Sequence, residues 1–311
     1  MNIIPVPKRL VEISLYNVAA LSPQALVEEG EREYRERLER AAQKIIASGA
    51  RIIMLTGPSA SGKTTSAHKL ADTLAGCGVP ARVISLDNFF LGADNYPLLP
   101  DGTKDYESPA TLDMPEINRC LSELALQEHT DLPVYDFRLE KRADEREHIE
   151  LNGGVCIVEG IHALNPELTR LLPENGVFRI YAGLREEYST DGLRTIDTRD
   201  LRLCRRMLRD DADRGHSPEK TLAMWERVLA GENLYIKVYK NTANLILDTS
   251  FSYELGVIAS LVQQELERTP ENVPHYERLL HTAQHFAGVQ RLPVQCVPST
   301  SMLREFYANR V

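Results

Sequence analysis

The residues of this chain most able to do chemistry lie together at positions 57–64, in the order Gly-Pro-Ser-Ala-Ser-Gly-Lys-Thr. A short apolar run precedes them (51–56), and a helical pattern follows them (64–76). A strand, a glycine loop and a helix N-terminus direct several backbone N–H groups at one point, where the helix dipole also favours negative charge. The pattern therefore predicts a cradle for a phosphate chain. Lys63 would reach the terminal phosphates, and the Thr64 hydroxyl would hold Mg²⁺.

This loop predicts that the protein binds ATP or another nucleoside triphosphate together with Mg²⁺. The alternative is a chance glycine turn, which the four fixed positions would produce on the order of once in a hundred chains of this length. The flanking strand and helix argue against that alternative. The loop and helix residues that we expect to contact the nucleotide are Gly57, Ser59, Ala60, Ser61, Gly62, Lys63, Thr64 and Thr65.

Two acids follow predicted strands, at the point where each strand ends. Asp87 comes after the run 81–86, and Glu159 ends the run 154–159. In parallel sheets, ligands bind beyond the carboxyl ends of the strands. We expect Asp87 to accept a proton from a hydroxyl that attacks the γ-phosphate, or to hold the metal through water. We expect Glu159 to orient Mg²⁺ beside Thr64. The alternatives are a turn or N-cap aspartate and a purely structural glutamate.

A cluster of arginines lies on one face of the helix predicted over 200–213. Arg202, Arg206 and Arg209 are spaced by four and three residues, and Arg214 follows the helix. In an acidic protein, such a cluster favours a lid that closes over transferring phosphates and neutralises their charge. The alternative is a solvated face whose arginines pair with nearby aspartates. Those aspartates are Asp200, Asp210, Asp211 and Asp213.

The long segment between the second and third predicted strands, 91–150, carries aromatic residues interleaved with acids. Tyr106-Glu107-Ser108-Pro109 and Pro133-Val134-Tyr135-Asp136-Phe137 are the clearest stretches. Such residues suit a pocket that stacks a ring and binds sugar hydroxyls. They would equally suit a small cap with a core of its own, and the sequence leaves both interpretations open.

The order of elements predicts the fold class. Five apolar, β-rich runs (51–56, 81–86, 154–159, 177–182 and 244–248) alternate with helical patterns. This alternation predicts an α/β fold with a five-stranded parallel sheet covered by helices on both faces. We expect three segments. Residues 1–50 would form an N-terminal extension and lead-in helix, and residues 51–270 a domain built around the phosphate loop, with an insertion at about 91–150 and a lid at about 199–216. Residues 271–311 would form a helical tail.

Composition excludes some classes of function. The chain has 311 residues, of which 43% are hydrophobic and 26% charged, with a net charge of −9. An acidic chain is a poor candidate for general binding to nucleic acid or to an anionic membrane. The five cysteines form no C-x-x-C pair, and no signal-peptide or transmembrane run is present, so we expect a reduced, cytoplasmic protein. The sequence leaves a homo-oligomer open.

Over roughly residues 51–250, these motifs resemble the uridine kinase and phosphoribulokinase family of P-loop kinases. The motifs that carry the resemblance are the loop at 57–65, Ser85-Leu86-Asp87-Asn88-Phe89-Phe90, Tyr106-Glu107-Ser108-Pro109, Tyr135-Asp136-Phe137, Val158-Glu159-Gly160-Ile161 and the arginine-rich stretch 202–215. A closer resemblance is to the kinase portion of longer bacterial nucleoside kinases, whose extra domains are similar to the N-terminal regions of threonyl-tRNA synthetase. It includes the stretches 161–166, 195–199 and 298–306. We expect only the helix leading into the kinase to be kept here.

The resemblance implies roles for individual residues. It implies Asp87 as general base, Glu107 as a ligand of ribose hydroxyls, and Tyr106 and Tyr135 as aromatics facing a base. The arginines that it implies as phosphate contacts are Arg206, Arg209 and Arg214. Three positions depart from the family pattern. Phe90 replaces a tyrosine, Glu140 stands where uridine kinases have a histidine that reads the pyrimidine edge, and Met224 stands where they have a base-contacting glutamine.

These observations predict an ATP- and Mg²⁺-dependent kinase that phosphorylates a hydroxyl of a small molecule, best matched by a nucleoside 5′-hydroxyl. One alternative is a kinase of another hydroxyl metabolite, such as a sugar phosphate or pantothenate. Another is a nucleotide-binding switch without a small substrate, although the guanine motif N-K-x-D of GTPase switches is absent.

Overall fold

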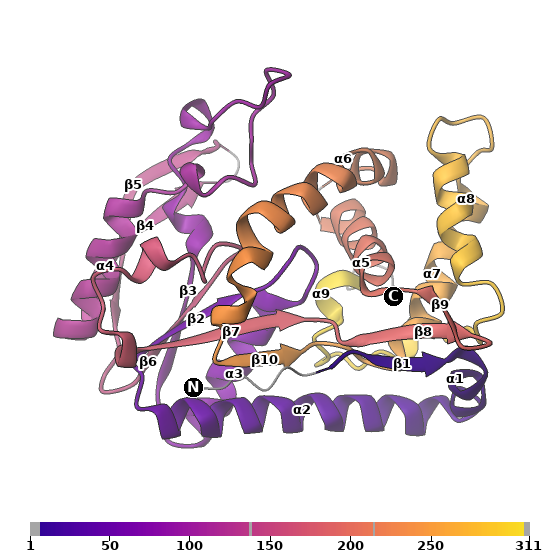
Figure 1. Ribbon diagram of the computed structural model, residues 1–311, viewed down its shortest axis with the longest axis horizontal. Helices are drawn as coiled ribbons and strands as arrows, with labels where there is room; N and C mark the ends of the chain where they lie inside the picture. The colour runs from indigo at the N-terminus through magenta and orange to yellow at the C-terminus, as the bar shows by residue number, and fades with distance from the viewer. Residues whose placement is uncertain (1–6, 137–138, 214, 308–311) are drawn as a thin grey trace.

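The computed structural model describes residues 7–136, 139–213 and 215–307, and a parallel five-stranded sheet forms its centre (Figure 1). All neighbouring strands of this sheet pair in parallel. The prediction of a five-stranded parallel sheet is therefore confirmed. In spatial order its strands are β10 (Leu245–Asp248), β7 (Val177–Gly183), β2 (Ile52–Thr56), β6 (Val155–Glu159) and β3 (Ala81–Ser85).

Helices cover both faces of the sheet, because alternate side chains of its central strands enter two separate cores. Ile53 and Leu55 of β2 pack with α2, α3 and α7, whereas Ile52 and Met54 pack on the opposite face with α4. The helices are α1 (Ile13–Ala19), α2 (Pro23–Ser48), α3 (Lys63–Gly76), α4 (Met114–Gln127), α5 (Thr198–Asp213), α6 (Pro218–Gly231), α7 (Glu254–Arg268), α8 (Tyr276–His285) and α9 (Arg304–Tyr307).

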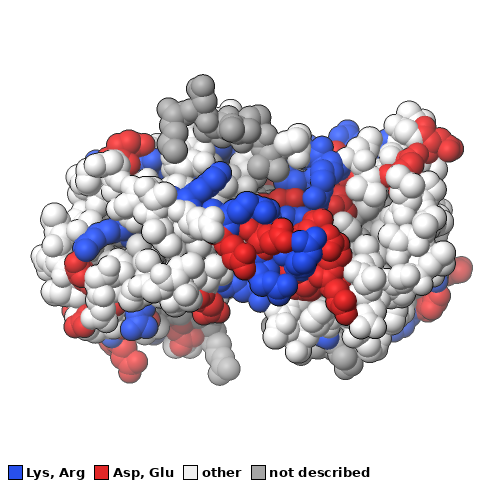
Figure 2. Space-filling view, turned by 90° about the horizontal axis from the view of Figure 1, so that it is seen from below, with Lys and Arg blue, Asp and Glu red and all other residues white. Residues whose placement is uncertain are grey.

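The outer face of α2 is a charged surface. The helix runs along the lower edge of the molecule in Figure 1, and the view from below shows basic and acidic side chains interspersed in a cluster at its centre (Figure 2). Arg32 pairs with Glu29 and Glu36 at helical spacings, and Arg40 also pairs with Glu36. Because both signs alternate, this surface has no single-sign patch that would attract a polyanion.

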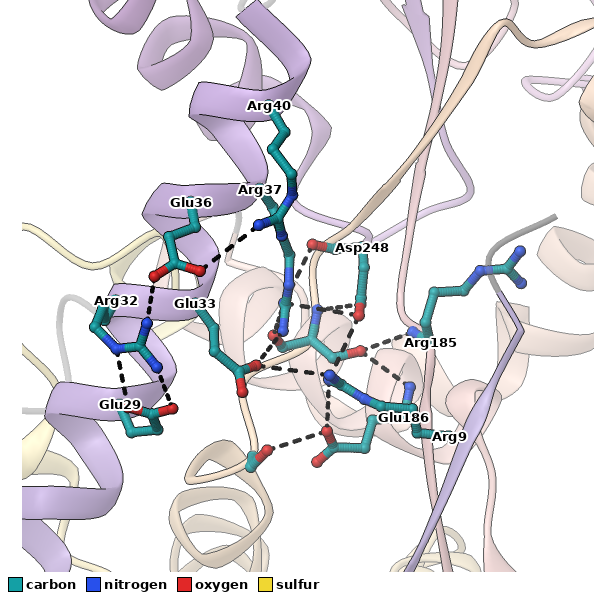
Figure 3. Close-up of polar contacts among 12 residues, drawn as sticks. Arg9, Glu29, Arg32, Glu33, Glu36, Arg37, Arg40, Arg185, Glu186 and Asp248 are labelled. Atoms are coloured by element: carbon teal, nitrogen blue, oxygen red, sulfur yellow. Dashed lines mark hydrogen bonds and ion pairs between the residues drawn. The ribbon is translucent and has the colours of Figure 1, made fainter. Parts of the chain in front are cut away.

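A second, three-stranded sheet joins the N-terminal residues to the middle of the chain. Strand β1 (Arg9–Glu12) pairs in parallel with β8 (Glu186–Thr190), which pairs with β9 (Leu193–Ile196) in an antiparallel hairpin. Charged side chains hold this junction, as Figure 3 shows. Arg9 pairs with Glu186 and Asp248, and Arg37 from α2 donates to the carbonyl oxygen of Ser250. The described part of the N-terminal segment is thus built into the sheet region.

The insertion and the lid pack against different cores, since α4 joins the core of Ile52 and Met54 whereas α5 joins the core of Ile53 and Leu55. The insertion contains α4 and a hairpin of β4 (His129–Asp136) and β5 (Lys141–Glu150). Helices α5 and α6 follow, and the chain returns to β10 through the π-helix η6 (Glu232–Ile236) and the 3₁₀ helix η7 (Lys237–Thr242). The helical pattern at 64–76 is present as α3, and the helix predicted over 200–213 is present as α5, each within two residues at both ends.

The C-terminal segment returns to the body of the molecule. Helix α8 projects from it, whereas α9 lies between α5 and the sheet in Figure 1. Tyr16, Val27, Leu201 and Phe306 belong to the same core as Ile53. Described residues of all three predicted segments (1–50, 51–270 and 271–311) therefore share one core.

Within the described residues, no helix combines the length and the apolar character needed to cross a membrane.

Candidate active site

The phosphate-binding pattern lies where a strand, a loop and a helix meet. Strand β2 ends at Thr56, and α3 begins at Lys63 after Gly62, whose φ of 79° is in the left-handed region that favours glycine. A Cβ on Gly57 would collide with the carbonyl oxygen of Ala182 in β7, so only glycine fits there. The Ser61 hydroxyl is buried and, among the described residues, has no hydrogen-bond partner. The loop therefore has the close approach and spare polar groups that a phosphate chain would use.

A hydroxyl and a buried acid lie together beside this loop, as the metal prediction requires. The Thr64 hydroxyl donates to Oε2 of Glu159 at 3.2 Å, and the Ser85 hydroxyl donates to Oε1 at 2.9 Å. Burial raises the pKa of Glu159, and the nearby Lys63 ammonium acts in the opposite direction. Hard oxygen donors of this kind suit Mg²⁺, which usually keeps several water ligands. The set formed by Thr64, Ser85 and Glu159 therefore fits Mg²⁺.

Asp87 follows β3 in the 3₁₀ turn η1 (Leu86–Phe89), where its backbone N–H donates to the Ser85 hydroxyl at 3.3 Å. Its negative charge contributes to the raised pKa of Glu159, which places the two carboxylates near each other. Asp87 thus lies at the carboxyl end of the sheet, close to the candidate metal ligands. This position is compatible with both predicted roles, proton acceptor and water-mediated metal ligand.

Glu107 lies beside the loop lysine and the lid. Burial raises its pKa from 4.5 to about 7, and the charges of Arg206 and Lys63 lower it whereas Glu232 raises it. The α6 helix approaches it closely, since a Cβ on Gly231 would collide with the Glu107 side chain. The structure therefore brings the predicted ligand of ribose hydroxyls next to the predicted phosphate site.

The aromatic residues of the insertion form a connected row. Tyr106 meets Tyr96 edge to face, with ring centroids 5.5 Å apart, and Phe90 contacts both Tyr96 and Tyr135 at 5.9 and 5.6 Å. Tyr135 is buried, at 7% exposure, whereas Tyr106 is 51% exposed. Tyr106 is thus the accessible ring at one end of the row, and Tyr135 is the buried ring at the other end, in contact with Phe90. Phe137, the last residue of the stretch predicted with Tyr135, lies outside the described residues.

The two residues that depart from the pyrimidine-reading pattern occupy different surroundings. Glu140 is exposed at the turn of the β4–β5 hairpin, with a φ of 49°, and its carbonyl oxygen accepts from the N–H of Ala93 at 3.2 Å. Met224 is half-buried in α6. In this arrangement Glu140 faces solvent.

The lid arginines reach the loop, but several are already paired with acids. Arg206 donates to the Ser59 hydroxyl at 2.8 Å and pairs with Asp210 at 3.2 Å. Arg209 also pairs with Asp210, at 2.7 Å. The structure therefore contains features of both predicted alternatives, a loop contact and ion pairs with aspartates. Arg214, the third predicted phosphate contact, lies outside the described residues.

Two other arginines of α5 form buried ion pairs that hold the loop. Arg202 pairs with Glu232 at 2.5 Å and donates to the carbonyl oxygen of Ser59 at 3.0 Å. Arg205, fully buried, pairs with Glu254 at 2.6 Å. Their guanidinium groups are therefore engaged within the protein rather than open to solvent.

The acids that contact the loop were missed by the sequence analysis. Glu232 accepts from the Ser59 N–H at 3.0 Å, and Glu305 accepts from the Thr65 hydroxyl at 2.6 Å. Neither belongs to a recognisable local pattern, since Glu232 follows a helix and Glu305 lies more than two hundred residues from Thr65. For Glu305 the one available signal was the stretch 298–306, whose resemblance to longer bacterial kinases was visible in the sequence.

Comparison with known proteins gives consistent matches. Residues 52–182 match the model of the Phosphoribulokinase / Uridine kinase family. The chain is 30% identical over 198 residues to a uridine kinase of Lactobacillus johnsonii, covering 63% of this chain and 85% of that protein. It is 28% identical over 197 residues to a uridine kinase of Deinococcus deserti, covering 63% of this chain and 86% of that protein.

The crystal structure of a candidate fructose transport system kinase from Silicibacter sp. TM1040 is similar in fold. The TM-score is 0.50 and the sequence identity 21%, with 67% of this chain and 98% of that chain covered. At this identity the likeness concerns the fold alone. The loop geometry and the matches to uridine kinases lead to one conclusion: the chain belongs to the phosphoribulokinase and uridine kinase family.

Proposed function

We propose that this protein is an ATP- and Mg²⁺-dependent kinase that transfers the γ-phosphate to the 5′-hydroxyl of a nucleoside. The observation that carries the proposal is the position of Glu107, a carboxylate able to bind a diol, beside Lys63 of the phosphate loop and Arg206 of the lid. The relatives named as uridine kinases support the same acceptor class.

On the nucleotide side, the chain supplies a cradle and positive charge. The first turn of α3 offers N–H donors, and Lys63 offers a point charge that suits the terminal phosphates. Thr64 and Glu159 would hold Mg²⁺, which when bound supplies charge neutralisation between the phosphate oxygens. Arg206 donates to the Ser59 hydroxyl, so its guanidinium lies beside the loop that would hold the phosphates.

On the acceptor side, three groups have distinct tasks. Asp87 would accept the proton of the attacking hydroxyl. Glu107 would bind the ribose hydroxyls as an acceptor, which requires its ionised form. Tyr106, exposed at the end of the aromatic row, offers a surface on which a base can stack.

Among the described residues, the two positions that depart from the pyrimidine-reading pattern offer little for recognising a base. Glu140 faces solvent, and Met224 makes at best weak hydrogen bonds. A pocket that does not hydrogen-bond one particular base discriminates weakly between bases. We therefore propose a nucleoside kinase with broad base preference.

The test is an acceptor screen under one set of conditions. ADP formation from Mg²⁺–ATP is measured with uridine, cytidine, adenosine, guanosine, inosine, a sugar phosphate and pantothenate. The 5′-deoxy analogue of the most active nucleoside is the matched control, because it keeps the base and the ribose diol but lacks the accepting hydroxyl. Turnover with nucleosides but not with this analogue supports the proposal. Turnover only with pantothenate or the sugar phosphate would replace it.

A further inference from the structure

The C-terminal segment 298–307 returns to the phosphate loop and packs against the start of α3. Lys69 of α3 donates to the carbonyl oxygen of Thr300 at 2.6 Å. At the other end, the Tyr307 hydroxyl donates to Glu254 at 2.6 Å. The ring of Phe306 lies 4.9 Å from the guanidinium of Arg205, whose own N–H points at the carbonyl oxygen of Ala60 in the loop at 3.4 Å. The segment is therefore fixed at both ends and touches the loop from the side of α5.

One residue of this segment packs directly on the loop glycine. A Cβ on Gly62 would collide with the sulfur of Met302, which is fully buried. Gly62 is the residue that immediately precedes α3. The C-terminal segment thus contacts the loop at the point where the phosphate-binding N–H groups begin.

The side chain of Glu305 lies on one of these donors. Its Oε2 accepts from the backbone N–H of Thr65 at 3.3 Å and from the Thr65 hydroxyl at 2.6 Å. Thr65 is in the first turn of α3, where N–H groups have no partner within the helix. A carboxylate is an anion with the same preference for this position as a phosphate.

The position of Thr65, just after the loop, indicates which phosphate is concerned. In loops of this kind the lysine reaches the β- and γ-phosphates, and the backbone N–H groups hold the α- and β-phosphates. Thr65 comes two residues after Lys63, along the helix and away from the loop. Its N–H and hydroxyl are therefore donors for the part of the phosphate chain next to the nucleoside.

We infer that Glu305 and a nucleotide phosphate compete for Thr65, so that Glu305 lowers the affinity for nucleotides and its side chain leaves Thr65 when one binds. The inference rests on the proposed function, since it takes the loop as a nucleotide site. It assigns to Glu305 a role in setting nucleotide affinity. Glu305 lies outside residues 52–182, the segment that matches the family model.

The first test is the charge-neutral variant Glu305→Gln, which keeps the shape of the side chain. Its dissociation constant for ADP is measured by titration calorimetry and compared with that of Glu271→Gln, an exposed glutamate of the same C-terminal region. We expect Glu305→Gln to bind ADP about tenfold more tightly than the wild type does. The reason is that ADP no longer has to displace a charge-assisted hydrogen bond, and the loss of one such bond corresponds to about this factor. Glu271→Gln should match the wild type. Unchanged or weaker binding of ADP by Glu305→Gln would overturn the inference and leave Glu305 as a helix cap.

The second test follows the segment itself. Hydrogen exchange of the amides in residues 302–307 is measured in the wild type with and without saturating ADP. The inference expects faster exchange with ADP, because the nucleotide releases Glu305 from Thr65. Slower exchange would show that the segment closes over the nucleotide and would contradict it. A failure of the proposed function would give a different result from a failure of this inference. If the wild type bound no ADP at millimolar concentration, the nucleotide site itself would be refuted.

Discussion

Replacing Glu107 with glutamine should stabilise the protein and impair catalysis at the same time. The Glu107 carboxyl is half-buried beside Glu232, and burial raises its pKa from 4.5 to about 7. Folding therefore favours the protonated form of this group. A glutamine has nearly the same shape as that protonated form and cannot ionise, so it keeps the packing without the buried charge.

The sign and size of the effect follow from linkage between protonation and folding. An acid whose pKa is higher in the folded state costs no stability below about pH 4.5, and its cost grows until the pH exceeds about 7. At about 1.4 kcal/mol per pKa unit, the cost at pH 8 is about 3 kcal/mol. Because the side chain keeps part of its solvent exposure, we reduce this figure to about 2 kcal/mol.

The assay is urea unfolding of wild type and Glu107→Gln without ligands at pH 5 and pH 8. We expect nearly equal free energies of unfolding at pH 5 and a gain of about 2 kcal/mol for the variant at pH 8. Glu271→Gln serves as the control, because its glutamate is exposed. The same gain at both pH values, or a loss at pH 8, would refute the reasoning.

The catalytic half of this prediction uses the same variant. If ionised Glu107 binds the acceptor hydroxyls, kcat/KM for the acceptor should rise with pH through about 7 in the wild type. In Glu107→Gln, kcat/KM for the acceptor should be about a hundredfold lower than in the wild type and should not rise with pH through about 7. The variant should still bind ADP. A variant as active as the wild type at pH 8 would exclude Glu107 from the acceptor site.

Three further predictions concern other parts of the site. Asp87→Asn should keep ADP binding and lower kcat by roughly 10²- to 10⁴-fold, as expected for loss of a general base. An unchanged kcat with weaker binding of Mg²⁺–ATP would instead assign Asp87 to the metal site with Glu159. Glu254→Gln should lower the free energy of unfolding by about 3 kcal/mol or more in urea, because it leaves the buried Arg205 guanidinium without its charged partner, and a loss below about 1 kcal/mol would contradict this account. The ratio of kcat/KM for uridine to that for adenosine should be small, since Glu140 faces solvent, and a ratio of about a thousand would show that other residues read the pyrimidine.

The sequence predicted the elements that depend on local patterns. Each strand of the main sheet was visible as an apolar run, because strands buried on both faces need apolar residues at nearly every position. The loop at 57–64 was visible because glycine, lysine and threonine are needed at fixed positions by the phosphate chemistry itself. Thr64 and Glu159 were brought together as expected, since the carboxyl ends of parallel strands meet at one edge.

Contacts between distant segments could not be predicted in this way. Strand β1 pairs with β8 through residues such as Leu10 and Glu187, and four residues form too short a run to indicate a strand. Helical periodicity showed that Arg202 and Arg206 share a face, but it could not show that Glu232 lies opposite Arg202. The contact of Glu305 with Thr65 belongs to the same class, because a single acid carries no pattern.

The most direct test of the central claim is the transfer of phosphate from γ-labelled ATP to a nucleoside by the wild type, Lys63→Ala and Glu107→Gln. The account predicts a labelled nucleoside 5′-monophosphate with the wild type. It predicts loss of this product in Lys63→Ala, which lacks the charge on the terminal phosphates. It predicts a strong reduction in Glu107→Gln, which should still bind ADP. Release of the label only as inorganic phosphate in the presence of every nucleoside, or equal transfer by all three proteins, would contradict it.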